Sequence, residues 1–217
     1  MLYLNRCSTD GQIVNFSKDG TSVGSIGVAS SELYFSSGNT GLYFDDVNNL
    51  IRPTNNAGGL RDNIADLGKS DSRFKDLYLG GGVRLGGTAA ANSLDHYEEG
   101  TWTPSVSVGS VSYSEAKYTR IGRVTHVSAY LNNFTNRTSS STVTISGIPI
   151  VADGYASQGV MYQYIAGSGD AVTAYLSDGG SAILLYSTVS GGGYDSISHS
   201  QLNSSSANVF LSLTYVV

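Results

Sequence analysis

The sequence is poor in cysteine, proline and charge, and each shortage excludes a class of protein. Its one cysteine, Cys7, cannot form an intrachain disulfide and lacks the spaced partners of a zinc site. The chain has 3 prolines and no strict Gly-X-Y period among its 27 glycines, which rules out collagen. Charged residues make up 13% of the chain, too few for a polyelectrolyte disordered tail. We therefore expect a folded protein with Cys7 as a buried or half-buried small hydrophobe.

Long apolar runs and a positive balance of charge are also missing. No run approaches the ~20 residues that a membrane-spanning helix needs, and the first residues lack the apolar core of a secretory signal. The formal net charge is −5, whereas binding to nucleic acid requires lysine and arginine to neutralise phosphates. The sequence therefore predicts neither membrane insertion nor nucleic-acid binding.

Basic residues are absent from the whole C-terminal part. No lysine or arginine follows Arg137, and the only acids of this part are Asp153, Asp170, Asp178 and Asp195. An ordinary protein surface is about a quarter or more charged. Serine, threonine, asparagine, glycine and the hydroxyls of tyrosine must therefore hydrate this surface.

Short apolar segments separated by turn residues fill the chain from Met1 to about His96. The segments cover residues 13–16, 23–28, 33–35, 42–44, 50–51, 74–79 and 83–85. The pairs between them, such as Asp19-Gly20 and Gly38-Asn39, contain residues that can adopt positive φ. Apolar segments that recur about every ten residues with such turns predict short β-strands.

Strands this short predict an oligomer. They carry too little apolar material to enclose a core within one chain. The tripeptide Leu-Tyr-Phe recurs at 33–35 and 42–44, each time followed by a polar residue. A chain that cannot bury its apolar stripe alone stacks it against copies of itself. We therefore expect a homo-oligomer, and a trimer in particular.

From Tyr97 onward the predicted strands are longer and alternate between apolar and polar residues. They cover residues 125–131, 160–166, 171–176, 181–189 and 209–217. A period of two on such strands, with polar turns between them, predicts a β-sandwich or jelly roll. The expected fold class is therefore all-β, with a short-stranded fibrous shaft over residues 1–96 and a C-terminal head over residues 97–217.

Several motifs at the junction of these parts resemble a known family. They read IADLG at 64–68, RFKDLYL at 73–79 and NSLDHYEEGTWTP at 92–104, followed by KYTRIGRV at 117–124 and ISGIPI at 145–150. They resemble motifs of bacteriophage tail-fibre and other distal tail proteins, in which the first two together close a slender shaft and the third opens a terminal β-domain. Upstream, residues 4–6, 10–11, 16 and 19–26 also resemble fibre shafts. The resemblance covers residues 1 to about 150.

The resemblance implies a location and a set of partners. It places the chain in the tail fibre of a virion, where it contacts other phage tail proteins and attaches to a host cell-surface receptor, a glycan in particular. His96 stands where the family more often has an acid. No segment resembles the self-cleaving chaperone that follows some fibres, so we expect no autoproteolysis.

Catalytic and cofactor sites are not predicted. The glycine-rich stretches at 80–82 and 167–169 lack the Lys-Ser/Thr of a phosphate-binding loop, so they indicate turns. The three histidines, His96, His126 and His199, show no metal spacing. Glu98 and Glu99 could suggest a glycosidase pair, but adjacent strand residues point to opposite faces and cannot flank one bond.

A calcium site is the one metal alternative. Asp45 and Asp46 lie close to Asn48 and Asn49, and clustered oxygen ligands suit calcium. The spacing matches no EF-hand loop, and such residues are common in turns. A structural turn is the favoured interpretation, and we predict neither a metal nor a cofactor.

The C-terminal part contains the best candidates for binding. Tyrosine supplies rigid amphipathic contact area, and aspartate and asparagine hydrogen-bond to hydroxyls, a combination typical of paratopes and suited to sugars. Some tyrosines, such as Tyr162 and Tyr164, share a predicted face with Val160 and are candidates for the core. The predicted receptor-binding residues are Tyr155, Asp170, Asp178, Tyr194, Asp195 and Asn203.

Three functions remain open at this point. The first is a tail fibre whose head binds a host receptor, with several weak sites gaining avidity. The second is a tailspike-type polysaccharide depolymerase, which needs two carboxylates about 5–10 Å apart. The third is a purely structural collar, decoration or adaptor protein of the virion.

Overall fold

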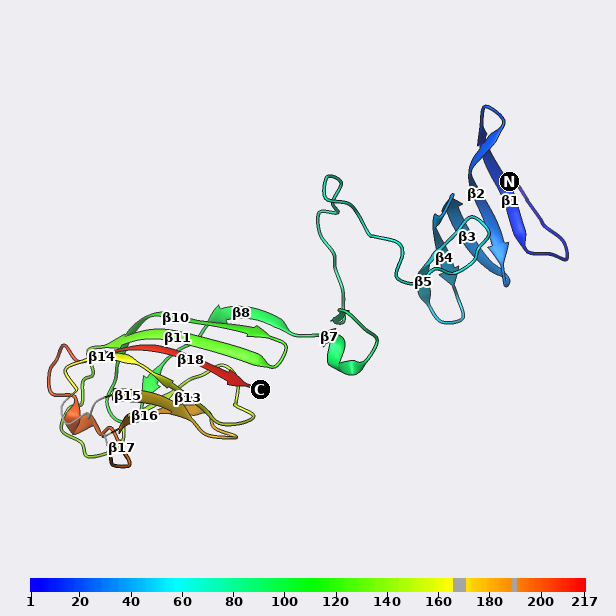
Figure 1. Cartoon of the computed structure of the whole chain (residues 1–217). Coiled ribbons are helices and arrows are strands. Elements are labelled where there is room, and N and C mark those ends of the chain that lie inside the picture. The colour runs from blue at the N-terminus through cyan, green and yellow to red at the C-terminus, as the bar shows by residue number, and fades with distance from the viewer. Residues whose placement is uncertain (166–170, 189–190) are drawn as a thin grey trace. The chain divides into compact units, whose positions relative to one another are not determined.

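The structure is all-β. It is a computed structural model that describes residues 1–165, 171–188 and 191–217, and its sheets are all antiparallel (Figure 1). Within these residues the only helical segments are two short 3-10 turns, η1 (Ala90–Asn92) and η2 (His199–Gln201), and no helix has the length and apolar character to cross a membrane. The chain divides into two compact units, Met1–Tyr78 and Leu79–Val217. The second unit therefore begins ahead of Tyr97, where the sequence suggested the start of the head.

The first unit is a five-stranded meander in which each strand pairs with the next along the chain. Its strands are β1 (Gly11–Lys18), β2 (Thr21–Ala29), β3 (Glu32–Ser37), β4 (Thr40–Asp45) and β5 (Leu50–Thr54). They contain the first five predicted segments, so these predictions are confirmed. Asp19 and Gly20 both have positive φ and form the tight turn between β1 and β2.

One face of this sheet is buried although it is largely polar. Tyr34 and Tyr43 are its largest side chains, and smaller polar residues surround them. The loop after β5 covers this face, because the Tyr34 hydroxyl donates to the Asn56 carbonyl at 3.3 Å and Gly58 lies against Ala29 and Tyr34. The Tyr43 hydroxyl donates to the Ala29 carbonyl at 3.1 Å. The core of this unit is therefore built from tyrosines and hydrogen bonds.

The opposite face is apolar and uncovered. Leu33 lies opposite Phe44, Phe44 lies opposite Ile51, and Phe35 lies opposite Leu42. The exposed fractions of Phe16, Leu33, Phe35, Leu42 and Ile51 range from 41% to 66%. We call this surface the apolar face; its members are Phe16, Ile26, Leu33, Phe35, Leu42, Phe44 and Ile51. Contiguous apolar surface of this kind is a mark of association.

Two predictions for the N-terminal part are wrong. Residues 74–79 form no strand, and Phe74, Leu77 and Tyr78 are at least 65% exposed, because a strand needs a hydrogen-bonding partner and no described segment pairs with this one. The next predicted segment does pair, as β6 (Val83–Arg84) with β7 (Ser93–Leu94). Cys7 is exposed rather than buried, because it precedes the first strand and no core covers it.

The second unit consists mainly of two antiparallel sheets. One has the order β14-β18-β11-β10-β8; the other has the order β13-β15-β16-β12-β9, with β17 beside β16. The strands are β8 (Tyr97–Thr101), β9 (Ser105–Val106), β10 (Ser112–Ile121), β11 (Val124–Asn132), β12 (Thr144–Ser146), β13 (Ala156–Gly159), β14 (Met161–Gln163), β15 (Ala171–Leu176), β16 (Ala182–Thr188), β17 (Tyr194–Ser196) and β18 (Asn208–Val216). Figure 1 shows them as two layers.

The inward faces of both sheets supply one hydrophobic core. From one sheet come Val127, Leu131 and Leu213, and from the other come Ile145 and Leu185, all fully buried. The predicted alternation of 125–131, 171–176 and 209–217 is confirmed by the burial of every second residue. Trp102 is also buried here and donates its indole N–H to the Ser128 carbonyl at 3.0 Å.

The predicted strand at 160–166 is confirmed only over residues 161–163, which form β14; residue 166 lies outside the described residues. The chain changes sheets at Val160, because β13 pairs with β15 whereas β14 pairs with β18. Val160 and Tyr162 pack against the core, but Tyr164 has φ of +57° and is 50% exposed. Its left-handed backbone ends the extended conformation, so Tyr164 does not share the face of Val160.

Because the Tyr215 hydroxyl is buried, we expect the folded protein to lose stability at alkaline pH. This hydroxyl donates to the Ile150 carbonyl at 2.9 Å, and burial raises the pKa of Tyr215 to about 12. The folded state thus favours the protonated phenol, a contribution that is complete below pH about 10 and is lost as the pH rises to about 12. The free energy of unfolding should fall by on the order of 2 kcal/mol over this range. Urea titrations should show a weaker alkaline decline in Tyr215→Phe; an identical decline would contradict this assignment.

We expect the position of Gly147 to accept no side chain. Its φ is +99°, and an added Cβ would lie 2.1 Å from the Thr103 carbonyl oxygen. Gly154 is a matched control, because its φ is also positive, at +125°, but a Cβ there would meet no atom within 4 Å. We expect Gly147→Ala to cost at least about 2 kcal/mol more than Gly154→Ala in thermal unfolding of the second unit. Equal costs would show that the clash is relieved by a backbone shift.

Candidate functional site

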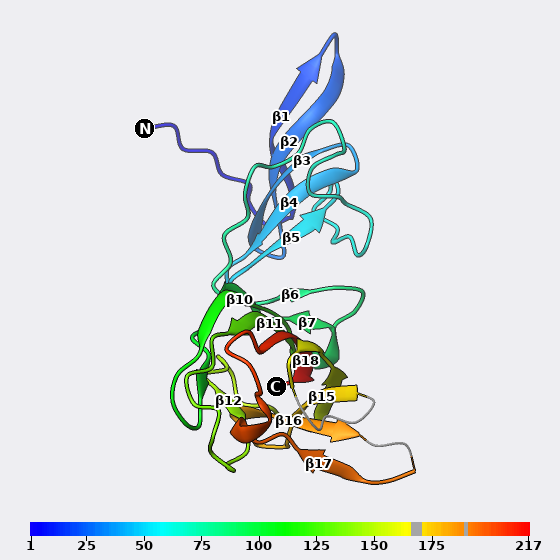
Figure 2. The ribbon, with the colours of Figure 1, turned by 90° about the vertical axis from the view of Figure 1, so that its left-hand side faces the viewer.

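Four tyrosines form a diagonal row on the outer face of the sheet that contains β15, β16 and β17. Tyr155 precedes β13, Tyr175 lies on β15, Tyr186 on β16, and Tyr194 begins β17. The ring centroids of successive tyrosines are 6.4, 5.7 and 5.2 Å apart. The first pair is stacked and the other two pairs meet edge to face. We call these residues the tyrosine row; Figure 2 shows the strands that carry it.

Strand register produces the diagonal. Thr173 lies opposite Tyr186, and Thr188 lies opposite Tyr194, so each step to the next strand moves the tyrosine by two residues along the sheet. Diagonal neighbours at this spacing are within reach of aromatic side chains. Because Val172 and Leu185 point into the core on the same strands, the tyrosines must point outward.

The row borders an open hollow of about 340 Å³. It is lined by Ser157, Thr173, Tyr175, Tyr186, Thr188 and Tyr194. Tyr175 and Tyr186 are half-buried, whereas Tyr155 and Tyr194 are 75% and 72% exposed. The two central rings therefore sit lower on the sheet, and the two outer rings stand at the ends of the row.

The hollow is neutral and rich in hydroxyl groups. Its described lining contains only serine, threonine and tyrosine. Burial, followed by the neighbouring tyrosines, raises the pKa of Tyr175, so its hydroxyl stays protonated and able to donate. Aromatic faces next to hydroxyl donors and acceptors suit a ligand that has both an apolar face and hydroxyl groups. A sugar ring is such a ligand.

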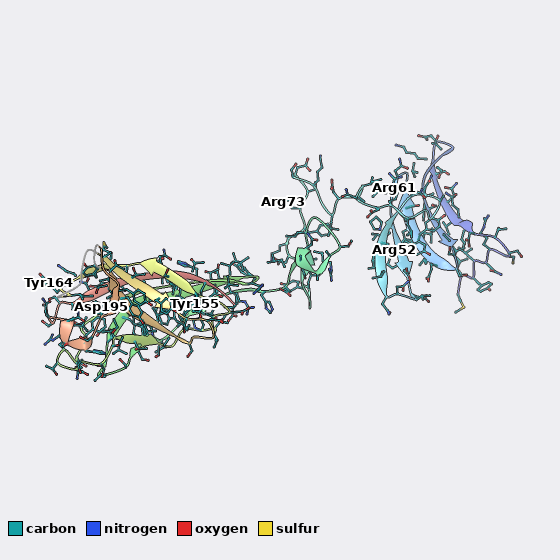
Figure 3. All side chains as sticks on the ribbon, turned by 60° about the horizontal axis from the view of Figure 1, so that its bottom comes forward. Arg52, Arg61, Arg73, Tyr155, Tyr164 and Asp195 are labelled. Atoms are coloured by element: carbon teal, nitrogen blue, oxygen red, sulfur yellow. The ribbon has the colours of Figure 1, made fainter. Side chains whose placement is uncertain are left out.

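Of the five predicted receptor-binding residues that the structure describes, two belong to the tyrosine row. Tyr155 and Tyr194 stand at opposite ends of the tyrosine row. Asp195 follows Tyr194 on β17 and pairs with the inward-facing Ser187, so its side chain points to the other side of the strand. Figure 3 labels Tyr155 and Asp195.

The remaining predicted residues lie elsewhere. Asp178 is exposed in the turn between β15 and β16. Asn203 lies in an exposed loop, where its backbone N–H donates to the Tyr164 carbonyl at 3.2 Å, and it is not among the described residues that line the hollow. Asp170 lies outside the described residues.

The two central tyrosines were absent from the predicted receptor-binding set. Their exposure could have been inferred from the sequence, because alternation in 171–176 puts Val172, Ala174 and Leu176 on one face and leaves Tyr175 on the other. The sequence could not show that Tyr186 and Tyr194 continue the same row. That requires the pairing of β15 with β16 and of β16 with β17.

The glutamates and histidines considered for catalysis have structural partners. The Tyr118 hydroxyl donates to Glu98 and the Tyr97 hydroxyl donates to Glu99, so the two carboxylates lie on opposite faces of β8, as predicted. His199 is fully buried, with its ring nitrogens 3.2 Å from the Ser107 hydroxyl and 3.2 Å from the Asn136 carbonyl. These residues hold loops and strands in place.

Asp45 acts as a turn residue. Its carboxylate accepts from the Asn48 backbone N–H at 3.0 Å and from Arg52 at 2.9 Å. The Asn48 backbone hydrogen bond, with further help from Arg52, lowers the pKa of this carboxyl. Within the described residues no three His, Cys, Asp or Glu side chains gather as metal ligands. The turn interpretation accounts for this cluster without calcium.

Comparison of the chain with protein-family models, with curated proteins and with solved structures gives no match. Its function must therefore be argued from its own residues.

Proposed function

We propose that this chain is a bacteriophage tail-fibre protein of the virion, and that its second unit is a head that binds a host cell-surface glycan. The observation that carries the proposal is the tyrosine row beside a neutral hollow rich in hydroxyl groups. Such a surface offers aromatic stacking and hydrogen bonding together, at a low cost in side-chain entropy. The tail-fibre identity rests on the sequence motifs at 64–104, 117–124 and 145–150.

The proposal includes a homotrimer. The apolar face of the first unit leaves five of its seven apolar side chains more than 40% exposed in the single chain. Full burial of an exposed large apolar side chain contributes about 1.5–3 kcal/mol, and these side chains are already about half covered, so covering this face yields on the order of 5–10 kcal/mol. That is comparable with the cost of association. We propose that copies of the shaft, residues 1–96, cover one another's apolar faces, while contacts with other tail proteins follow from the resemblance alone.

The finer fold belongs to the same proposal. In it, residues 97–217 form a β-sandwich or jelly-roll head, and the two sheets with their shared core support this assignment. A trimer would present three tyrosine rows at fixed spacing. Weak individual sites would then gain avidity through their effective concentration.

Binding is favoured over cleavage by the chemistry of the hollow. Hydrolysis of a glycosidic bond requires two carboxylates about 5–10 Å apart. The described lining of the hollow offers none. The tyrosine row is therefore suited to holding a sugar, and a structural collar would have no need of it.

The test is adsorption of the purified, fluorescently labelled chain to a panel of bacterial strains and to polysaccharides extracted from their surfaces. We expect stable binding to some strains, competition by their polysaccharide, and no release of reducing ends. Release of reducing ends would instead identify a depolymerase. Failure to bind any strain would favour a structural virion component and would overturn the proposal.

A further inference from the structure

We infer that the tyrosine row selects neutral oligosaccharides and discriminates against acidic ones. This inference rests on the proposed glycan-binding function and adds the chemical class of the ligand. It concerns the charge of the sugar, because charge is what the residues around the row restrict most strongly.

Every element that carries the row lies in a part of the chain without basic side chains. Residues 138–217 contain no lysine or arginine anywhere in their sequence. Arg123, in the turn between β10 and β11, pairs with Asp153 at 2.9 Å and donates to the Val217 carbonyl at 3.2 Å. No basic side chain lines the hollow among the described residues. A carboxylated sugar would therefore find no cation there.

Apart from histidine, the charged side chains that this part does carry are all acidic, so none of them would attract an anionic sugar. Asp153, Asp170, Asp178 and Asp195 are its only ionised side chains at neutral pH apart from any histidine charge. Moving a carboxylate from water toward a partly buried surface has a high cost unless a cation or several hydrogen bonds compensate. Neutral hydroxyl groups can satisfy the hydroxyls of a neutral sugar, but without a cation they offset only part of the cost of desolvating a carboxylate.

The size of the hollow suits a short neutral oligosaccharide. A volume of about 340 Å³ lies near the lower limit of small-molecule sites. Tyr155 and Tyr194, at the two ends of the row, are 75% and 72% exposed, so a ligand can reach both rings. An oligosaccharide can lie along it with apolar ring faces on the aromatic rings.

The test uses the full chain on a glycan array that pairs neutral hexose and N-acetylhexosamine oligosaccharides with counterparts of equal length carrying a uronic or sialic acid. We expect neutral glycans to bind and each acidic counterpart to bind at least about tenfold more weakly. Raising NaCl to about 0.5 M should leave the affinity for the neutral glycan unchanged, because no ion pair is screened.

A charge-adding variant provides the converse result. Ser157 is exposed and lines the hollow, so Ser157→Lys should bind the acidic counterparts about tenfold more tightly than the unaltered chain, whereas the neutral control Ser157→Gln should not. Equal binding of acidic and neutral glycans by the unaltered chain would overturn this inference but leave the proposed function standing. Binding to no glycan of either kind would overturn the proposed function itself.

Discussion

Replacing Leu42 with aspartate is expected to separate the assembled protein into single chains. Leu42 belongs to the apolar face, where it lies opposite Phe35, and it is 49% exposed in the single chain. An aspartate there already contacts water in the single chain, but it would be buried without a partner in the assembly. Burial of an unpaired carboxylate costs several kcal/mol per copy, enough to offset the gain from covering this face. Light scattering should show a molar mass falling from three chains to one.

Val47→Asp is the matched control. Val47 is also a large apolar residue and is 80% exposed, but it lies in the turn between β4 and β5, outside the paired strands whose side chains form the apolar face. The same charge at Val47 should leave the molar mass unchanged. If the unaltered protein is a compact single chain at micromolar concentration, the apolar face is not an interface and the trimeric part of the proposal is wrong.

Replacing Tyr186 with alanine is expected to abolish adsorption to any strain that the unaltered protein binds. Tyr186 lies between Tyr175 and Tyr194, with ring centroids 5.7 and 5.2 Å away, so its loss divides the row and removes part of the floor of the hollow. Loss of a central aromatic contact costs at least about 2 kcal/mol, which is on the order of 30-fold in the affinity of one site. Avidity should enlarge the loss in whole-cell binding.

Two variants separate this effect from loss of folding. Tyr130 is a half-buried tyrosine on the outer face of the other sheet, where its ring centroid lies 4.7 Å from that of Phe210. Tyr130→Ala therefore removes a comparable ring from the same unit. It should retain adsorption. Tyr186→Phe keeps the ring and should retain most of the binding. If Tyr130→Ala and Tyr186→Ala lose adsorption equally, the tyrosine row is not the binding site.

The local alternation of side chains was readable from the sequence. The inward residues of β11, β15 and β18 agree with the period-two pattern, because a strand that covers a core must place every second residue inside. The turn at Asp19-Gly20 was equally readable, because both residues tolerate positive φ. The absence of basic residues after Arg137 also belongs to the sequence alone.

The partners of each strand were decided by the tertiary structure. Residues 156–163 form one continuous segment of the sequence, yet its two strands, β13 and β14, join different sheets. Each of them pairs with a strand distant along the chain. Residues 74–79 have the pattern of a strand but no partner within the described chain, so none forms.

The site depends on the same distinction. The sequence by itself determined that tyrosines and hydroxyl residues would dominate a C-terminal surface without basic side chains. Only the register of β15 with β16 and of β16 with β17 decided that Tyr175, Tyr186 and Tyr194 continue one row and that Asp195 points away from it. Alternation is a property of neighbouring residues, whereas register is fixed by hydrogen bonds between segments far apart in the chain.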